Sequence, residues 1–359
     1  MNYESVFLYP INSSTYQPIN LCVLRGKFLY LSSYYSTTSN GVKMHFSHHH
    51  LLSIQELTAE DITRIMDTAA SFKEVSNREV KRVPTLRGHT IVNLFYEPST
   101  RTRISFEIAA KRLSADVLNV AIASSSVVKG ESLKDTVKTI EAMQPSIIVI
   151  RHAEAGVPQM VSRLINCSVI NAGDGSHEHP TQGLLDMFTI REKKGRLDGL
   201  RVAIIGDILH SRVARSNIWG LIKMGARVVL CGPPTLMPIG IEKLGVEITY
   251  NLLEAVRDAD VIMLLRLQLE RQKTSMFPTI REYAEFYGLQ ESHLQAAKSD
   301  VLIMHPGPIN RDIEISGAIA DGQHSCILEQ VTNGIAVRMA VLYLVSMGNV
   351  HTVAQASSL

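Results

Sequence analysis

The sequence predicts an α/β fold of two doubly wound parallel-sheet domains, with the active site in the cleft between them. Short apolar runs alternate with amphipathic stretches from residue 84 onward, and a polar, glycine-bearing segment at residues 193–199 interrupts the alternation once. Such alternation is typical of parallel strands joined by crossover helices. Charged and polar residues recur directly after the apolar runs, and ligands of such sheets bind beyond the carboxyl ends of the strands.

The composition is that of an ordinary globular protein. Of the 359 residues, 45% are hydrophobic and 19% are charged, which is enough for two domains with sizeable cores. The net charge of +2 gives no reason to expect nucleic acid or an anionic membrane as a partner. No apolar run reaches the ~18 residues of a membrane span, so we expect a soluble chain. The four cysteines are widely spaced and form no Cys-x-x-Cys pair, which argues against a disulfide framework or a zinc site and fits the cytoplasm.

Residues 1–48 differ from the rest of the chain. They are rich in Tyr, Ser, Thr and Asn, and only residues 21–30 suggest a strand. No basic segment precedes an apolar core, so a secretory signal is not expected. We expect an extension outside the fold, poorly ordered; the alternative is an over-long start, with Met44 as the true first residue. The histidine run at residues 48–50 is interpreted as solvated rather than metal-binding.

The first predicted domain covers residues 49–193. A capping sequence at Thr58 and Asp61 opens a helix whose apolar positions lie on one face. The strands expected after it are residues 90–96, 117–122, 147–150 and 169–171. The helices expected between them are residues 105–113, 133–143, 157–165 and 181–192.

The second predicted domain covers residues 194–330. Its expected strands are residues 201–205, 227–230, 246–250, 261–265 and 301–304. Its expected helices are residues 213–224, 252–257 and 291–297. A final apolar helix within residues 331–350 has no strand after it, and we expect it to pack back on the first domain.

The start of the second domain tests a dinucleotide-binding hypothesis. Residues 202–207 (VAIIGD) match the opening of a Gly-x-Gly-x-x-Gly fingerprint, but Ile208 and Ser211 occupy the later glycine positions. Without those glycines the backbone cannot approach a pyrophosphate. The sequence therefore argues against a dehydrogenase.

Residues 97–103 (EPSTRTR) form the most informative segment. They lie between a predicted strand and a predicted helix, where the first N–H groups of the helix have no internal partner. Those donors and the positive end of the helix dipole favour an anion, and arginine adds a planar fork that suits a phosphate. A helix cap alone needs one hydroxyl and no arginine. We therefore predict a phosphate site here.

Further polar residues follow five other predicted strands and would meet in the same cleft. They are Arg151 with His152, residues 173–182, residues 207–212, residues 266–268, and residues 305–308. Arg101, Arg151, Arg212 and Arg266 suit substrates that carry a phosphate and more than one carboxylate. No nucleophile–base pair and no metal-ligand spacing stands out, so we expect catalysis by positioning and charge stabilisation, without metal or cofactor.

Three motifs in this order, residues 99–103 (STRTR), 179–182 (HPTQ) and 305–308 (HPGP), resemble the aspartate/ornithine carbamoyltransferase family. The resemblance covers residues 51–348 or so and leaves the first 48 residues outside. It implies transfer of the carbamoyl group of carbamoyl phosphate to an amine. With L-aspartate as acceptor, the product is N-carbamoyl-L-aspartate, and the reaction is the committed step of pyrimidine synthesis.

The resemblance also implies roles for individual residues. Those expected to hold carbamoyl phosphate are Ser99, Thr100, Arg101, Thr102, Ser125, Arg151, His179, Gln182, Pro306, Gly307 and Pro308. Among them Arg101, Thr102, Arg151 and His179 are expected to be catalytic, with His179 as a hydrogen-bond donor to the carbonyl oxygen. Those expected to hold aspartate are Lys129, Arg212, Arg266 and Gln268.

The serine-rich segment at residues 124–131 has two interpretations. By itself it is a flexible loop with a solvated lysine. In the family, the matching loop enters the site of a neighbouring subunit through Ser125 and Lys129. The resemblance therefore implies a homotrimer with shared active sites, possibly within a larger assembly.

The acceptor can also be judged from the sequence. The family resemblance would give an ornithine enzyme a His-Cys-Leu-Pro motif and a Ser-Met-Gly loop, and this chain has neither. Arg266 would repel ornithine and attract a dicarboxylate. We therefore expect aspartate; the alternatives are another amine acceptor or an inactive scaffold, although an inactive copy would be expected to have lost Arg101, Arg151, His179 or Lys129.

Overall fold

The computed structural model describes residues 21–24, 27–30, 46–121, 130–268 and 279–356, and the chain divides into two compact units, Met1–His45 and Phe46–Leu359. In the first unit, β1 (Leu21–Leu24) and β2 (Lys27–Tyr30) form an antiparallel pair, where the sequence suggested one strand.

The end of the predicted N-terminal extension belongs to the second unit. Phe46 is buried, and His48 Nε2 lies 3.0 Å from a carboxylate oxygen of Asp61. His50 Nδ1 accepts a hydrogen bond from the Val169 backbone (3.1 Å), and burial lowers its pKa to about 4. The expectation that the histidine run is solvated is therefore wrong, because His48 and His50 pack against the fold.

The first sheet is parallel, with the strand order β4-β3-β5-β6. Its strands are β3 (Thr90–Phe95), β4 (Asp116–Ala121), β5 (Ile147–His152) and β6 (Ser168–Asp174). The accompanying helices are α1 (Ala59–Ser76), α2 (Thr100–Arg112), α3 (Leu133–Ala142), α4 (Val157–Ser162) and α5 (Pro180–Lys194), with a 3-10 turn at Pro84–Leu86. The predicted capping box is present: Thr58 Oγ1 accepts from Asp61 N, and the Asp61 carboxylate accepts from Thr58 N.

The second sheet is also parallel, with the order β11-β10-β7-β8-β9. Its strands are β7 (Arg201–Ile205), β8 (Arg227–Cys231), β9 (Glu247–Thr249), β10 (Val261–Leu264) and β11 (Leu302–Met304). Its helices are α6 (Arg212–Lys223), α7 (Leu252–Val256), α8 (Ile280–Tyr287), α9 (Glu291–Leu294) and α10 (Gly317–Ala320), with 3-10 turns at Pro234–Leu236 and Ile241–Leu244. The fold class predicted from the sequence is confirmed, although α8 and α10 were not predicted.

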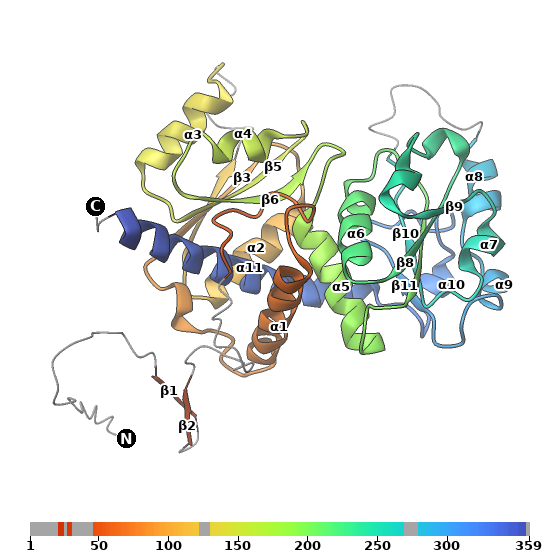
Figure 1. Ribbon diagram of the computed structural model, residues 1–359, viewed down its shortest axis with the longest axis horizontal. Helices are drawn as coiled ribbons and strands as arrows, with labels where there is room; N and C mark the ends of the chain where they lie inside the picture. Colours follow the sequence, from red (N-terminus) through yellow and green to blue (C-terminus); the bar gives the residue numbers. More distant parts are fainter. Residues whose placement is uncertain (1–20, 25–26, 31–45, 122–129, 269–278, 357–359) are drawn as a thin grey trace. The chain divides into compact units, whose positions relative to one another are not determined.

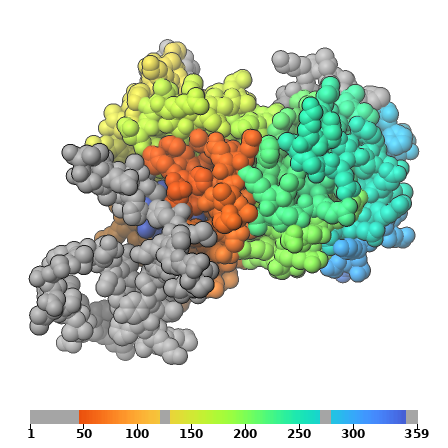
Figure 2. Space-filling view, in the orientation of Figure 1, coloured from red at the N-terminus to blue at the C-terminus, as the bar shows by residue number. Residues whose placement is uncertain are grey.

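Helices α5 and α6 lie side by side between the two sheets (Figure 1). On the face shown in Figure 2, the orange surface near residue 50 adjoins the green surface of the following half. Lys223 at the end of α6 secures this junction, since its ammonium donates to the backbone carbonyls of Ile54, Gln55 and Leu57 at 2.6–3.0 Å. The two halves of the second unit are thus connected by packing and by hydrogen bonds.

The last helix, α11 (Ile327–Ala356), is longer than predicted and packs against α1, α2 and α5 (Figure 1). Its segment Ile327–Met347 is long and apolar enough to cross a membrane by length and composition. The sequence analysis predicted no such segment. However, 72% of the most apolar part of that segment is buried within the fold, as in the core helix of a folded domain.

Candidate active site

The predicted phosphate loop lies where β3 meets α2. The strand ends at Phe95, Ser99 is the N-cap residue of α2, and Ser99 Oγ donates to Thr102 Oγ1 (3.0 Å). Thr102 is buried at the first turn. The N-terminus of this helix, which carries a partial positive charge, therefore faces the same cavity as the loop.

A single cavity of about 710 Å³ collects the predicted site residues from both sheets. The predicted residues that line it are Ser99, Thr100, Arg101, Thr102, Arg151, His179, Gln182, Arg212, Arg266, Gln268, Pro306, Gly307 and Pro308. Ser125 and Lys129 lie outside the described residues. Every predicted site residue that the structure describes thus reaches one cavity.

The cavity is strongly cationic. The arginines in its lining are Arg101, Arg151, Arg212, Arg266, Arg311 and Arg338, whereas Glu97 is the one carboxylate among the described lining residues. Burial, followed by the nearby Arg266, lowers the pKa of Arg101. Since Arg101 comes from the first half and Arg266 from the second, the two halves present like charges to each other across the cavity, and a bound anion would relieve their repulsion.

Glu97 connects the two halves at one end of this cavity. One of its carboxylate oxygens accepts from Arg151 Nη2 (2.5 Å) and also from Arg212 Nη2, and the other accepts from Arg212 Nη1 (3.0 Å). Arg151 also donates to the Ala172 carbonyl (3.2 Å). The sequence placed Glu97 in the phosphate loop but gave it no role, because its partners come from distant segments.

Gly173 allows this cluster to form. Its φ is +115°, and a Cβ atom at this position would lie 3.1 Å from both Arg151 Nη1 and Arg212 Nε. A side chain here would therefore be strained and would displace both guanidinium groups. Glycine is required by the close approach of the two arginines to the backbone.

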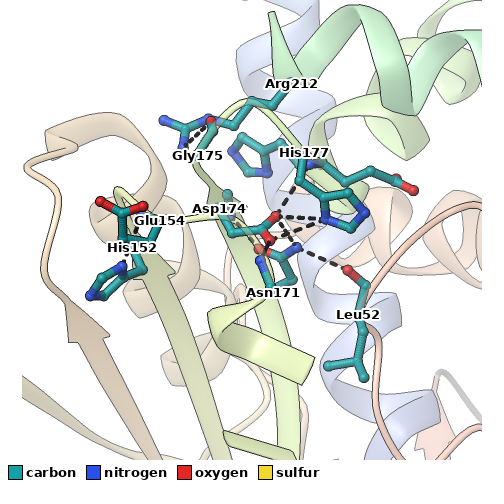
Figure 3. Close-up of polar contacts among 12 residues, drawn as sticks. Leu52, His152, Glu154, Asn171, Asp174, Gly175, His177 and Arg212 are labelled. Atoms are coloured by element: carbon teal, nitrogen blue, oxygen red, sulfur yellow. Dashed lines mark hydrogen bonds and ion pairs between the residues drawn. The ribbon is translucent and has the colours of Figure 1, made fainter. Parts of the chain in front are cut away.

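Asp174, the last residue of β6, holds the turn that leads into α5 (Figure 3). Its carboxylate accepts from Asn171 Nδ2 (2.8 Å), from the backbone of Glu178 (3.2 Å), and from the backbone of Gly156 (2.7 Å). Arg212 donates to the Gly175 carbonyl of the same turn (3.3 Å). These bonds fix the start of α5, where His179 is the N-cap residue.

His179 is buried, and its backbone N–H donates to Ser216 Oγ on α6 (2.9 Å). Its pKa is held well below the usual value, first by burial and then by the positive charges of Arg151, Arg338 and Arg212. The imidazole is therefore neutral near pH 7. A neutral imidazole can donate one hydrogen bond to an oxygen that gains negative charge.

The buried carboxylate of Glu314 holds two loops of the second half together. Glu314 accepts from the backbone N–H groups of Leu267 (3.0 Å) and Asn310 (2.8 Å), so it ties the turn after β10 to the loop after β11. In that second loop, Gly307 has φ +64°, and a Cβ there would lie 3.3 Å from Arg101 Cζ. The loop thus lies against the guanidinium group of the phosphate loop.

The sequence analysis missed the two polar residues of α11 that line the cavity, Gln330 and Arg338. Arg338 is buried, and burial and the nearby Arg151 lower its pKa to about 10, although Asp186 opposes this shift. A lone arginine inside an apolar helix was the available signal, since an arginine is almost never fully buried unless it is paired. The sequence could not show that Arg338 lines the cavity, because this depends on where α11 packs.

The comparisons with known proteins agree with this geometry. Family models match residues 49–192 (aspartate/ornithine carbamoyltransferase, carbamoyl-P binding domain) and residues 198–345 (aspartate/ornithine carbamoyltransferase, Asp/Orn binding domain). An aspartate carbamoyltransferase catalytic subunit of Syntrophotalea carbinolica is 59% identical over 305 residues, which are 85% of this chain and 97% of the relative. That of Geotalea daltonii is 58% identical over 86% of this chain and 100% of the relative.

Solved structures show the same fold. Aspartate transcarbamoylase from Trypanosoma cruzi in complex with N-(phosphonacetyl)-L-aspartic acid has a TM-score of 0.75 at 29% identity, covering 82% of this chain and 94% of that one. Ornithine carbamoyltransferase from Pyrococcus furiosus also has a TM-score of 0.75, at 28% identity, covering 84% and 98%. The chain belongs to the aspartate/ornithine carbamoyltransferase family.

Proposed function

We propose that the cavity binds carbamoyl phosphate on the side of the first sheet and L-aspartate on the side of the second, with residues 49–193 and 194–330 as the two substrate domains and α11 packed back on the first. The chain transfers the carbamoyl group to the amine of aspartate, giving N-carbamoyl-L-aspartate and phosphate, as the names of its relatives indicate. The supporting observation is the set of arginines from both sheets in one cavity.

The proposed phosphate contacts come from the start of α2. Ser99, Thr100, Arg101 and Thr102 present hydroxyls, a guanidinium fork and backbone N–H groups at one helix N-terminus. These are the donors that phosphate oxygens accept best. Binding there would place the carbamoyl group toward the centre of the cavity.

The proposed catalytic groups are donors to the carbonyl oxygen, namely Thr102, Arg151 and His179. When the amine attacks, the C–N bond forms, the carbonyl oxygen gains charge, and the neutral imidazole and the guanidinium stabilise it. The C–O bond to phosphate then breaks, and the phosphate oxygen keeps both bonding electrons. The departing phosphate takes a proton from the attacking amine. Gln182 and the backbone of residues 306–308 would hold the carbamoyl amide.

The proposed aspartate contacts are Arg212, Arg266, Gln268 and, from a neighbouring subunit, Lys129. The ion pairs between Glu97 and both Arg151 and Arg212 imply that substrate anions compete with Glu97 for these guanidinium groups. A cationic wall of this kind disfavours ornithine, whose side chain carries an amine. Fold similarity alone does not choose the acceptor, because one similar structure is named an ornithine enzyme.

We also propose a cytoplasmic homotrimer in which Ser125 and Lys129 complete the site of a neighbour. The free cysteines among the described residues suit a reducing compartment. Mixing Arg101→Ala and Lys129→Ala chains tests the shared site. Two inactive proteins should regain about a quarter of wild-type activity after random reassembly if each site takes residues from two chains, and none if each site is built from one.

The activity test is carbamoyl transfer by the purified chain with L-aspartate and L-ornithine compared side by side. We expect turnover with aspartate and about 10²-fold less with ornithine, because the arginines oppose a cationic side chain. Preference for ornithine would contradict the aspartate assignment and leave the phosphate half intact. Absence of transfer to both acceptors would contradict the proposed activity.

A further inference from the structure

Asp186 is a buried carboxylate beside the cavity to which no step of the reaction assigns a role. It lies on α5 one helical turn after Gln182, and it is fully buried between α5, α6 and α11. Burial raises the pKa of its carboxyl group to about 6, although Arg338 and three amide donors oppose that shift. The group is therefore ionised at pH 7.5, and an ionised carboxylate can only accept hydrogen bonds.

Three side-chain amides donate to this carboxylate. Oδ1 accepts from Gln182 Nε2 (2.9 Å) and from Gln330 Nε2 (2.8 Å), and Oδ2 accepts from Asn217 Nδ2 (2.8 Å). Because the carboxylate cannot donate, each amide must turn its nitrogen toward Asp186 and its oxygen away. One charge therefore fixes the orientation of both glutamines.

The two glutamine oxygens face different partners. Gln182 lines the cavity, and because its nitrogen is bonded to Asp186, its Oε1 is the atom left to face the ligand space. Gln330 Oε1 accepts from the His305 backbone (3.0 Å) at the start of the loop of residues 305–308. Asp186 thus links Gln182, which lines the cavity, through Gln330 to the loop of residues 305–308.

We propose that Asp186 is a positioning residue that selects carbamoyl phosphate, because it forces Gln182 to present a hydrogen-bond acceptor to the substrate NH₂ group. This inference rests on the proposed contact between Gln182 and the carbamoyl amide. A freely turning glutamine would present either its oxygen or its nitrogen. Only the oxygen recognises an NH₂ group and distinguishes it from the methyl group of acetyl phosphate.

The kinetic test compares the KM of carbamoyl phosphate with the inhibition constant of acetyl phosphate, which has the same phosphate and carbonyl but a methyl group. In Asp186→Ala and in Gln182→Ala, we expect the preference for carbamoyl phosphate to fall by about tenfold, the worth of one buried hydrogen bond. The double variant should lose no more than either single variant, because both changes remove the same contact. A purely structural role of Asp186 would leave the preference of Asp186→Ala for carbamoyl phosphate unchanged.

Asp186→Asn is the matched control. Its oxygen can still accept from both glutamines, and its NH₂ group can face Asn217, whose own oxygen accepts if that side chain turns over. We expect it to keep the preference within about threefold of wild type. A tenfold loss in this variant would contradict the proposal, because the acceptor geometry would then not be sufficient.

A crystal structure of the wild-type protein with phosphonoacetamide keeps the proposal testable if Asp186→Ala fails to fold. We expect Gln182 to contact both the ligand amide nitrogen and Asp186. If Gln182 contacts the ligand but not Asp186, this inference is overturned and the proposed function stands. A ligand amide beyond hydrogen-bond distance of Gln182 would overturn the proposed role of Gln182 and this inference with it.

Discussion

The two walls of the cavity are built by different means. The wall from the first sheet consists of buried groups at helix starts and at a strand end: Thr102 at the start of α2, His179 at the start of α5, and Arg151 near the end of β5. The wall from the second sheet consists mainly of loops after β10 and β11, whose backbone N–H groups are held by Glu314.

The two walls differ in what fixes the positions of their side chains. Groups at helix starts and strand ends have their positions set largely by the core. The second half adds one support to this wall, since Ser216 on α6 accepts from the His179 backbone. The loops of the other wall depend on contacts across the cavity, such as Gly307 against Arg101 and His305 bonded to Gln330. The first wall is therefore expected to tolerate changes in the second better than the reverse.

The largest effect is expected from Arg101→Ala. Removal of the guanidinium fork should lower kcat/KM by about 10²–10³-fold, as for loss of one donor to a developing anion. Arg103→Ala is the matched control on the same helix, because Arg103 is exposed and does not line the cavity. Steady-state kinetics that gave both variants the same activity would contradict the assignment of this loop.

Arg266→Ala tests the independence of the two walls. We expect the KM for aspartate to rise by about 10²-fold, since a charged hydrogen bond contributes about 1.5–3 kcal/mol. The affinity for inorganic phosphate, measured by calorimetry, should stay within about threefold. Arg281→Ala, on the exposed side of α8, is the control. An equal loss of phosphate affinity would show that the phosphate side depends on the second wall as much as the aspartate side does.

Gly173→Ala tests the packing that brings the walls together. An added Cβ would press on Arg151 and Arg212, so activity should fall by about tenfold and stability by about 1–3 kcal/mol. Gly199→Ala is a matched control, because φ is +69° there and a Cβ would meet nothing within 4 Å. It should cost about 1 kcal/mol of stability and leave activity unchanged. Equal activity in the two variants would argue against the role of Gly173.

The last prediction concerns the dependence of stability on pH, where no change of activity is expected. Burial, followed by the charges of Arg101 and Arg266, lowers the pKa of His305 from 6.5 to about 3. A histidine with a lowered pKa in the folded state contributes stability above pH 6.5, and this is lost as the pH falls from 6.5 toward 3. The raised pKa of Asp186 makes stability rise on acidification, which is the opposite direction. This contribution is the same in the wild type and in a variant of His305.

His305→Gln removes this titration and leaves an acceptor for the Gly307 backbone N–H, which His305 Nδ1 accepts at 2.8 Å. The unfolding free energy of the variant should therefore fall less steeply on acidification, by up to about 1.4 kcal/mol per pH unit. Urea unfolding between pH 4 and 7 measures the difference. Parallel curves for the two proteins would mean that His305 is not kept neutral by the fold.

Much of the fold was accessible to sequence reasoning because buried parallel strands are short, continuous apolar runs. The residues predicted for β3 and β7 match the structure to within one residue. Helix α10 was missed because a four-residue helix shows no period, and α8 because only Tyr283 of its eight residues is buried. The phosphate loop was found because its hydroxyls, arginines and helix start are adjacent in the chain.

The sequence by itself determined the elements, the anion-binding turn at residues 97–103 and the set of polar strand ends, because these depend on neighbours in the chain. Only the tertiary structure decided that Glu97 joins Arg151 to Arg212 and that Asp186 accepts hydrogen bonds from Gln182 and Gln330. It also decided that His179 stays neutral. These properties arise from burial and from charges contributed by segments far apart in the sequence, and both exist only once α5, α6 and α11 have packed together.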